Sequence, residues 1–202
     1  MARKELNVDS VAEAYLALLA ERGVEYLFAN AGTDFAPIVE AYAKAAHTGL
    51  AAPKPLLATH ENLAMSMAHG YAAASGKVPA VKVHVSVGTA NALCGVFNAA
   101  RENVPILFTA GRSPLTEEGL AGARDTYIHW AQEMFDQAGM LREMVKWDYE
   151  LRNGVQLETV IDRALSIATG SGCGAAVAGI SPCSLTSTPS SGLARISRGR
   201  IR

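Results

Sequence analysis

Glu61 is the carboxylate of this sequence that is best placed to do chemistry. It follows a short apolar run, 55–58, and precedes a stretch, 61–75, in which small and apolar residues recur at helical spacing. In an open α/β fold, ligands bind just beyond the carboxyl ends of the strands. A carboxylate there suits proton transfer with a bound heterocycle, because desolvation favours its neutral form. The alternative is an ordinary first-turn acid that complements the helix dipole.

Three further turns are expected to lie at the same edge of the sheet as Glu61. They follow predicted strands at 24–29, 79–87 and 104–110, and they comprise residues 30–33, 87–91 and 111–112. Glycines in these turns could bind an anion at a helix N-terminus. The glycine-rich patterns of dinucleotide-binding and P-loop proteins are missing, which disfavours both nucleotide classes. His84 alternates with valines, so we expect it on the opposite side of its strand or at the end of the sheet.

The alternation of strands with helices predicts an α/β fold, a doubly wound parallel sheet flanked by helices. Helices are expected at 11–22, 35–47, 61–75, 93–100, 128–137 and 156–168. Asp9 and Ser10 can cap the first helix, and Gly23 and Gly76 stand where helix terminators belong. These signals define the elements that must hold the turns in place.

The composition narrows the classes of function. The chain has 202 residues, 50% hydrophobic and 18% charged, with a formal net charge of -1. No overall basic excess suggests a nucleic acid or an anionic membrane as a partner. No apolar run is long enough to span a bilayer, the first residues lack the apolar core of a secretion signal, and the three cysteines have no zinc-like spacing. A cytoplasmic location is therefore expected.

The last part of the chain differs in composition from the rest. From Ala164 to Arg202 there is no acidic residue, and glycine, serine and arginine accumulate. Such a segment has no sustained hydrophobic period, which predicts poor order. We expect a folded domain over 1–168 and a low-complexity tail over 169–202 that is unstructured or translated out of frame.

Several short segments together resemble the N-terminal pyrimidine-binding domain of thiamine-diphosphate enzymes. They are residues 30–35, 60–62, 70–72, 76, 84–91, 98–100 and 104–107. The order and spacing are most similar to those of the acetolactate synthase, pyruvate oxidase and benzoylformate decarboxylase group. The resemblance covers roughly residues 5–168 and implies the same doubly wound fold.

The resemblance also implies roles for particular residues. In that family a glutamate at the Glu61 position hydrogen-bonds the aminopyrimidine ring of the cofactor and promotes removal of the thiazolium proton. Ala31, Gly32, Val87 and Asn91 fall at positions beside the cofactor, so they are expected to bind it. Ala31 and Val87 stand where the family often has proline, which leaves the branch of the family open. For Asn91 the alternative is a plain helix-start residue.

The family resemblance implies partners as well. The substrate would be a small 2-oxo acid, and thiamine diphosphate would be held with Mg²⁺ by a separate domain whose Gly-Asp-Gly motif this sequence lacks. Some members also carry FAD. Members assemble as homodimers or tetramers, or pair with a separate diphosphate-binding subunit. Acetolactate-synthase-like decarboxylation and carboligation of pyruvate is the first expectation, and decarboxylation of another 2-oxo acid is the second.

Three accounts of the chain remain open at this point. It is the front part of a disrupted enzyme gene and inactive by itself, the pyrimidine-binding subunit of a split 2-oxo acid decarboxylase, or a non-catalytic binding module that kept the fold. The acid-free tail favours the first account.

Overall fold

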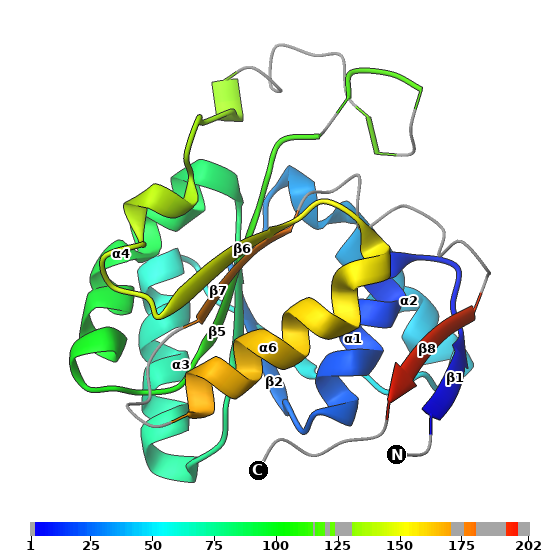
Figure 1. Ribbon diagram of the computed structural model, residues 1–202, viewed down its shortest axis with the longest axis horizontal. Coiled ribbons are helices and arrows are strands. Elements are labelled where there is room, and N and C mark those ends of the chain that lie inside the picture. Colours follow the sequence, from blue (N-terminus) through cyan, green and yellow to red (C-terminus); the bar gives the residue numbers. More distant parts are fainter. Residues whose placement is uncertain are drawn as a thin grey trace.

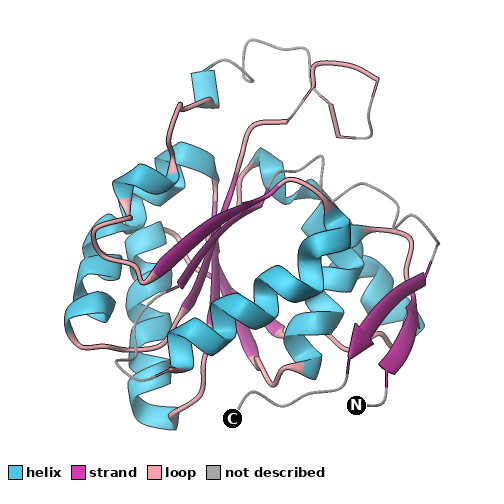
Figure 2. Cartoon of the chain, viewed as in Figure 1, coloured by secondary structure: helices cyan, strands magenta, loops and turns pink. Residues whose placement is uncertain are grey.

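In the computed structural model, a parallel sheet carries the candidate turns on one edge. The structure describes residues 3–114, 116–119, 122–123, 131–170, 176–180 and 193–197 (Figure 2). Within these residues six strands pair in the order β3-β2-β4-β5-β7-β6, and all pairs are parallel. The strands are β2 Tyr26–Ala29, β3 Lys54–Leu57, β4 Ala80–Val83, β5 Leu107–Gly111, β6 Trp147–Leu151 and β7 Ala176–Ile180. The predicted fold class is confirmed.

Helices cover both faces of the sheet. They are α1 Val11–Glu21, α2 Ala36–Thr48, α3 Glu61–Ser75, α4 Val85–Arg101 and α6 Leu157–Thr169, with short 3-10 turns η1 Thr33–Phe35, η2 Ala138–Met140 and η3 Gly154–Gln156. Figure 1 shows α3 and α4 on one side of the sheet and α1 and α6 on the other. A small antiparallel pair, β1 Arg3–Asn7 with β8 Leu193–Ser197, lies outside this sheet.

Local sequence signals start and stop these helices. Ser10 caps α1: its hydroxyl accepts from the Glu13 backbone N–H at 3.2 Å and donates to the Glu13 carboxylate at 3.0 Å. Gly76 ends α3 in the left-handed conformation at φ 69°, which glycine adopts without strain. The predictions for Ser10 and Gly76 are thus confirmed.

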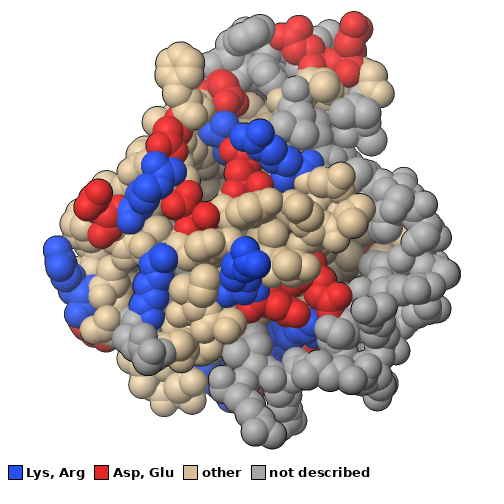
Figure 3. All heavy atoms as spheres, in the orientation of Figure 1, with Lys and Arg blue, Asp and Glu red and all other residues tan. Residues whose placement is uncertain are grey.

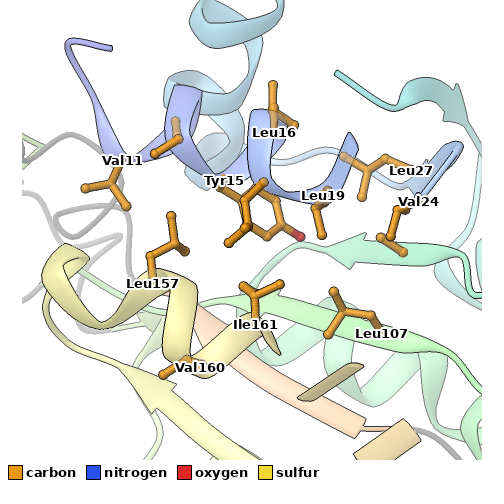
Figure 4. Packing of buried hydrophobic residues seen from close by; sticks show 14 of the residues in the cluster. Val11, Tyr15, Leu16, Leu19, Val24, Leu27, Leu107, Leu157, Val160 and Ile161 are labelled. Carbon is orange, nitrogen blue, oxygen red and sulfur yellow. The ribbon is translucent and has the colours of Figure 1, made fainter. Parts of the chain in front are cut away.

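The strands alternate side chains between two cores. Leu27, Ala80 and Leu107 join α1 and α6 in one cluster, and Figure 4 shows side chains of α1 such as Tyr15 facing those of α6 such as Ile161. The adjacent positions, including Phe28, Val81 and Phe108, join α3 and α4 in the other cluster. Burial on both faces is what a parallel sheet covered by helices requires.

Two boundaries differ from the sequence prediction around β4. The strand ends at Val83 instead of continuing to residue 87, and α4 already begins at Val85. Val85 takes a φ of 29°, which breaks the extended alternation. The Gly88 N–H then bonds to the His84 carbonyl at 2.6 Å, as in a helix. Residues 87–91, predicted as a turn, therefore form the first part of α4.

The region after residue 130 also differs from the prediction. Of the helix expected at 128–137, residues 128–130 lie outside the described residues, 131–132 are helical and 133–137 are not. Within 169–202, predicted to lack structure, β7 pairs with both β5 and β6, and β8 pairs with β1. The short Ala- and Gly-containing sequence of β7 has only a weak preference for a strand. Hydrogen bonding to the two neighbouring strands outweighs this. The rest of 171–202 lies outside the described residues.

The surface carries charges of both signs. On the face drawn in Figure 3, Lys and Arg side chains are interspersed with Asp and Glu. Arg22, by contrast, is buried: its guanidinium contacts Asp162 at 2.6 Å and Glu158 at 2.9 Å and so ties α1 to α6. Among the described residues, no helix is long and apolar enough to cross a membrane.

Candidate functional site

Glu61 lies at the carboxyl edge of the sheet, as its position after an apolar strand predicted. It is the first residue of α3 and only 6% exposed. The preceding turn is fixed at both ends: the Ala58 N–H bonds to the Ala29 carbonyl at 2.8 Å, and the His60 Nδ1 accepts from the Asn62 N–H at 3.1 Å. Glu61 therefore points from a rigid helix start and not from a loose loop.

Asn91 and Gly88, both on α4, define the surroundings of the Glu61 carboxylate. The Asn91 Nδ2 donates to Glu61 Oε2 at 3.1 Å. A Cβ added to Gly88 would lie 3.2 Å from Glu61 Oε1 and 3.0 Å from the Val83 Cβ. One oxygen is thus held by an amide, while the glycine keeps side-chain atoms away from the other.

The remaining predicted residues lie around this carboxylate or beside it. Val87 is 58% exposed on the first turn of α4, and Ala31 is exposed just after β2. Asn91 is exposed as well, although its amide reaches the buried Glu61. Gly32 contacts a different group, His84, whose ring lies so close that a Cβ on Gly32 would be 2.2 Å from its Cγ. Cofactor contacts of Ala31, Gly32, Val87 and Asn91 stay predictions.

The structure adds a pair that the sequence analysis missed, His84 and Asp34. His84 follows β4 and Asp34 lies in η1 after β2, and the His84 Nδ1 is 2.5 Å from Asp34 Oδ1. The other ring nitrogen, Nε2, is 3.4 Å from the Gln132 Nε2. Asp34 follows a predicted strand, but His84 lay within the strand predicted at 79–87, and nothing in the sequence indicated that these two strands are neighbours.

The site sits where the order of strands reverses. β2 lies between β3 and β4, so the chain adds its next strand on one side of β2 and the following strand on the other. Crevices at such switch points are the usual ligand sites of open α/β sheets. Glu61 follows β3, Gly32 and Asp34 follow β2, and His84 follows β4, which gathers an acid, a glycine and a His–Asp pair at this point.

The turn after β5 serves a different purpose from the one expected. A Cβ on Gly111 would lie 1.7 Å from Asp34 Oδ2, so this glycine makes room for the carboxylate. Arg112 donates to the Met134 carbonyl at 3.1 Å and to Glu133 Oε1 at 2.9 Å. Its guanidinium is therefore engaged by the 133–134 segment and is not aimed at Glu61.

A neighbouring cavity of about 270 Å³ opens between α4, η2 and β6. Its lining mixes acids with arginines, and Arg142 there is paired with Asp136 at 2.7 Å and with Asp148 at 3.1 Å. Gln137 closes one wall by donating to the Gly111 carbonyl at 2.9 Å and to the Thr89 hydroxyl at 3.0 Å. These paired charges leave the cavity without a clear excess of either sign.

Lys82 brings an unusual buried charge close to the site. It is fully buried on β4, and within the described part of the chain its Nζ has no hydrogen-bond partner. Burial lowers the pKa of Lys82, and the nearby Asp34 charge opposes that shift. The Nζ lies 5.1 Å from the centroid of the Phe35 ring, a cation–π distance.

No group of three or more His, Cys, Asp or Glu side chains able to hold a metal ion occurs among the described residues. The donor set around Glu61, a carboxylate, an amide and glycine backbone, suits an organic ring with hydrogen-bonding nitrogens better than a cation.

Sequence comparisons agree with this organisation. The family model "Thiamine pyrophosphate enzyme, N-terminal TPP binding domain" matches residues 9–140. An acetolactate synthase large subunit from Haemophilus influenzae is 30% identical over 160 residues, 79% of this chain and 26% of that protein. A benzoylformate decarboxylase from Pseudomonas aeruginosa is 26% identical over 166 residues, 80% of this chain and 28% of that protein. The chain thus spans about a quarter of the length of these curated relatives.

Solved structures show the same fold. A thiamin diphosphate-dependent enzyme from Mycobacterium smegmatis superimposes with a TM-score of 0.76 at 23% identity, covering 96% of this chain and 34% of that one. A thiamine diphosphate-dependent 4-hydroxybenzoylformate decarboxylase from Rhodococcus jostii RHA1 gives 0.73 at 22% identity, with 91% and 32% covered. At these identities the likeness concerns the fold alone.

Proposed function

This chain belongs to the thiamine pyrophosphate enzyme family and contains its N-terminal TPP binding domain, and from that premise we propose that it binds the pyrimidine half of thiamine diphosphate in an enzyme acting on 2-oxo acids. The observation that carries the proposal is the buried Glu61 carboxylate. Among the described residues it accepts a hydrogen bond from Asn91 on Oε2, while Gly88 keeps side-chain atoms away from Oε1.

These residues fit an aminopyrimidine ring. Gly88 packs against Val83 and Oε1 without a side chain of its own, so this position adds no atoms that would crowd the carboxylate. Ala31, Gly32 and Val87 would supply an apolar surface beside the ring, and the exposed Val87 is suited to be covered by it. Asn91 would keep the carboxylate oriented through its bond to Oε2.

The chemistry divides between cofactor and protein. Bound thiamine diphosphate supplies a carbon nucleophile for the 2-oxo carbonyl, with Mg²⁺ on its diphosphate. Glu61 would exchange a proton between Oε1 and the ring as an acid–base group within hydrogen-bond reach. His84, with Nδ1 on Asp34, can hold or give up a proton at Nε2 toward a substrate at the strand ends.

The acetolactate synthase relative favours decarboxylation and carboligation of pyruvate. The benzoylformate decarboxylase relative makes decarboxylation of a different 2-oxo acid the second candidate. We propose that Mg²⁺ and the diphosphate are held by a separate domain and that FAD, where the enzyme is a flavin-carrying member, binds a further one. A cytoplasmic location, predicted from composition, is kept as part of this proposal.

We infer that turnover needs a diphosphate-binding domain in addition to these 202 residues, so that the isolated chain is inactive. That domain would come from a homodimer or tetramer, or from a separate subunit as in a split decarboxylase. Exposed apolar side chains on α3 and α4 support such an assembly, namely Leu63 at 46%, Met67 at 37% and Phe97 at 39% exposure. A non-catalytic binding module is the alternative.

The test combines the chain with a diphosphate-binding domain from an acetolactate synthase relative, in the presence of thiamine diphosphate and Mg²⁺. Pyruvate consumption and exchange of the thiazolium proton into deuterated water are followed. Glu61→Gln should slow both by at least about 100-fold, the usual scale for a proton-transfer group. Glu40→Gln, an exposed residue of α2, is the matched control. Unchanged exchange in Glu61→Gln would overturn the proposal, and binding without turnover in any mixture would favour the module.

A further inference from the structure

Asp34 is a buried carboxylate whose role the proposed function leaves unassigned. It lies in η1, between β2 and α2, and is 4% exposed. Oδ1 meets the His84 Nδ1 at 2.5 Å, while Oδ2 is buried and has no hydrogen-bond partner among the described residues. Burying a carboxylate with an unpaired oxygen is costly, so the bond to His84 must be maintained by the surrounding fold.

Two glycines from different strand ends enforce the contact. A Cβ on Gly32 would lie 2.2 Å from the His84 Cγ, and a Cβ on Gly111 would lie 1.7 Å from Asp34 Oδ2. The imidazole and the carboxylate are thus each packed directly against a glycine backbone. Any other residue at either position would displace one member of the pair.

The backbone after His84 is strained. Val85 has a φ of 29°, a region that β-branched residues almost never occupy, and its side chain is 1% exposed. Strain of this kind persists only where the surroundings hold it. Here it turns the chain sharply from β4 into α4 and thereby directs the His84 side chain over Gly32 toward Asp34.

The charged and polar groups facing the pair come from two further segments. Lys82, two residues before His84, is fully buried and interacts electrostatically with Asp34. Gln132 faces the far ring nitrogen at 3.4 Å. The two ring nitrogens therefore have different surroundings: Nδ1 faces the buried Asp34 carboxylate and Nε2 faces the Gln132 amide.

We propose that Asp34 is a positioning residue that accepts the Nδ1–H of His84 and so fixes Nε2 as the nitrogen that exchanges a proton with the substrate. Asp34 itself touches neither substrate nor cofactor. A carboxylate that selects the tautomer of a histidine is a known way to orient an acid–base group. That the substrate receiving the proton is a 2-oxo acid rests on the proposed function. The tautomer of His84 does not depend on it.

The first measurement is made on the 202-residue chain without cofactor. Long-range ¹H–¹⁵N spectra of ¹⁵N-histidine protein are recorded at a pH of about 8, where an ordinary imidazole is neutral. His84→Gln assigns the signals among the five histidines. Wild type should show His84 protonated at Nδ1. Asp34→Asn should abolish this preference, because an amide can face the ring with its oxygen or its NH₂.

A second variant guards against a folding defect in the first. Gly111→Ala keeps both charges, but its methyl group would overlap Asp34 Oδ2 and displace the carboxylate from its present place, so it should also abolish the Nδ1–H preference. Asp148→Asn, which alters an exposed pair with Arg142, is the control and should leave the His84 signals unchanged. A wild-type ring protonated at Nε2, or ring signals unchanged in both folded variants, would overturn the proposal.

Turnover in the mixture with a diphosphate-binding domain separates this inference from the proposed function. If wild type is active, Asp34→Asn should lower kcat by about 10- to 100-fold with a smaller effect on KM, as for other residues that orient a functional side chain. An active wild type with an equally active Asp34→Asn would refute the positioning role alone. An inactive wild type would count against the proposed function, and the ring spectra would still decide the role of Asp34.

Discussion

The two faces of the sheet are built from different kinds of residue. The face covered by α1 and α6 is filled with large side chains such as Tyr15, Leu16 and Ile161, all fully buried. The face covered by α3 and α4 is rich in alanine and glycine, and there a Cβ on Gly95 would lie only 2.5 Å from the Met65 Cβ. Large side chains give the first face more apolar burial, whereas small ones let the backbones of the second approach closely.

The difference follows the position of the site. Glu61, Gly88 and Asn91 all belong to α3 and α4, and the close packing of these helices brings the Asn91 amide within 3.1 Å of the Glu61 carboxylate. The outer surface of the same helices leaves Met67 and Phe97 exposed. The face covered by α1 and α6 thus contributes mainly stability. The face covered by α3 and α4 contributes less, but it forms the site and a surface that a partner could cover.

The largest expected effect on stability is on the α1 and α6 face. Ile161→Ala should lower the free energy of unfolding by about 2–5 kcal/mol, because Ile161 is fully buried between α6 and α1. Chemical denaturation measures this loss, with Val155→Ala, 72% exposed, as the control. Thiamine diphosphate binding by the folded fraction should not change, and a specific loss of binding would contradict the division between the faces.

The site face should show the opposite pattern at Gly88. Gly88→Ala adds a methyl group 3.2 Å from Glu61 Oε1 and 3.0 Å from the Val83 Cβ, so the carboxylate proposed to bind the pyrimidine ring must shift. Cofactor binding, measured by calorimetry in the mixture with a diphosphate-binding domain, should weaken by about 10-fold or more, which corresponds to 1.4 kcal/mol. Stability should change by less than about 1 kcal/mol, because alanine's higher helix propensity offsets the tight contact. Unchanged affinity would place the ring elsewhere.

A pair of helix glycines tests how tightly α3 and α4 are packed. Gly95→Ala should destabilise the protein by about 1–3 kcal/mol, because its methyl group would overlap Met65. Gly70→Ala, in the exposed part of α3, meets nothing within 4 Å and should stabilise it by up to about 1 kcal/mol. Thermal melts of both variants provide the measurement. Equal shifts in the same direction would mean that the two helices are not in close contact.

Part of this organisation could be predicted from the sequence. Glu61 was identifiable because an apolar strand, a carboxylate and a small-residue helix follow one another locally. The start of α4 was not, since valines alternate through Val85 and Val87, and only the tertiary structure imposes the turn at Val85. The Asp34–His84 pair joins residues 50 positions apart, and their contact depends on which strands are neighbours.

The strands after residue 146 were missed for another reason. In β6 the residues from Trp147 to Glu150 are only partly buried, so no clear alternation marks the strand. β7 is positioned in the sheet by its pairing with β5 on one side and β6 on the other. Local patterns predict elements with a distinct buried side, whereas these two strands are specified by the neighbours they pair with.

Substitution of Lys82 should give the smallest change in stability and is the most specific test. Lys82 is a charged residue type on the side of β4 that α1 and α6 cover, which is otherwise apolar. Its pKa is lowered by burial, whereas in the unfolded chain it keeps the ordinary lysine value. At pH values between these two pKa values the unfolded state binds more protons, so the free energy of unfolding of the wild type should rise with pH.

Lys82→Met should be more stable than wild type by about 1 kcal/mol near neutral pH. The substitution removes a buried donor without a partner, while Asp34 loses a favourable charge. That advantage should shrink as the pH approaches the ordinary lysine value. Denaturant midpoints at several pH values measure it, and a constant difference would mean that Lys82 keeps the same proton in both states.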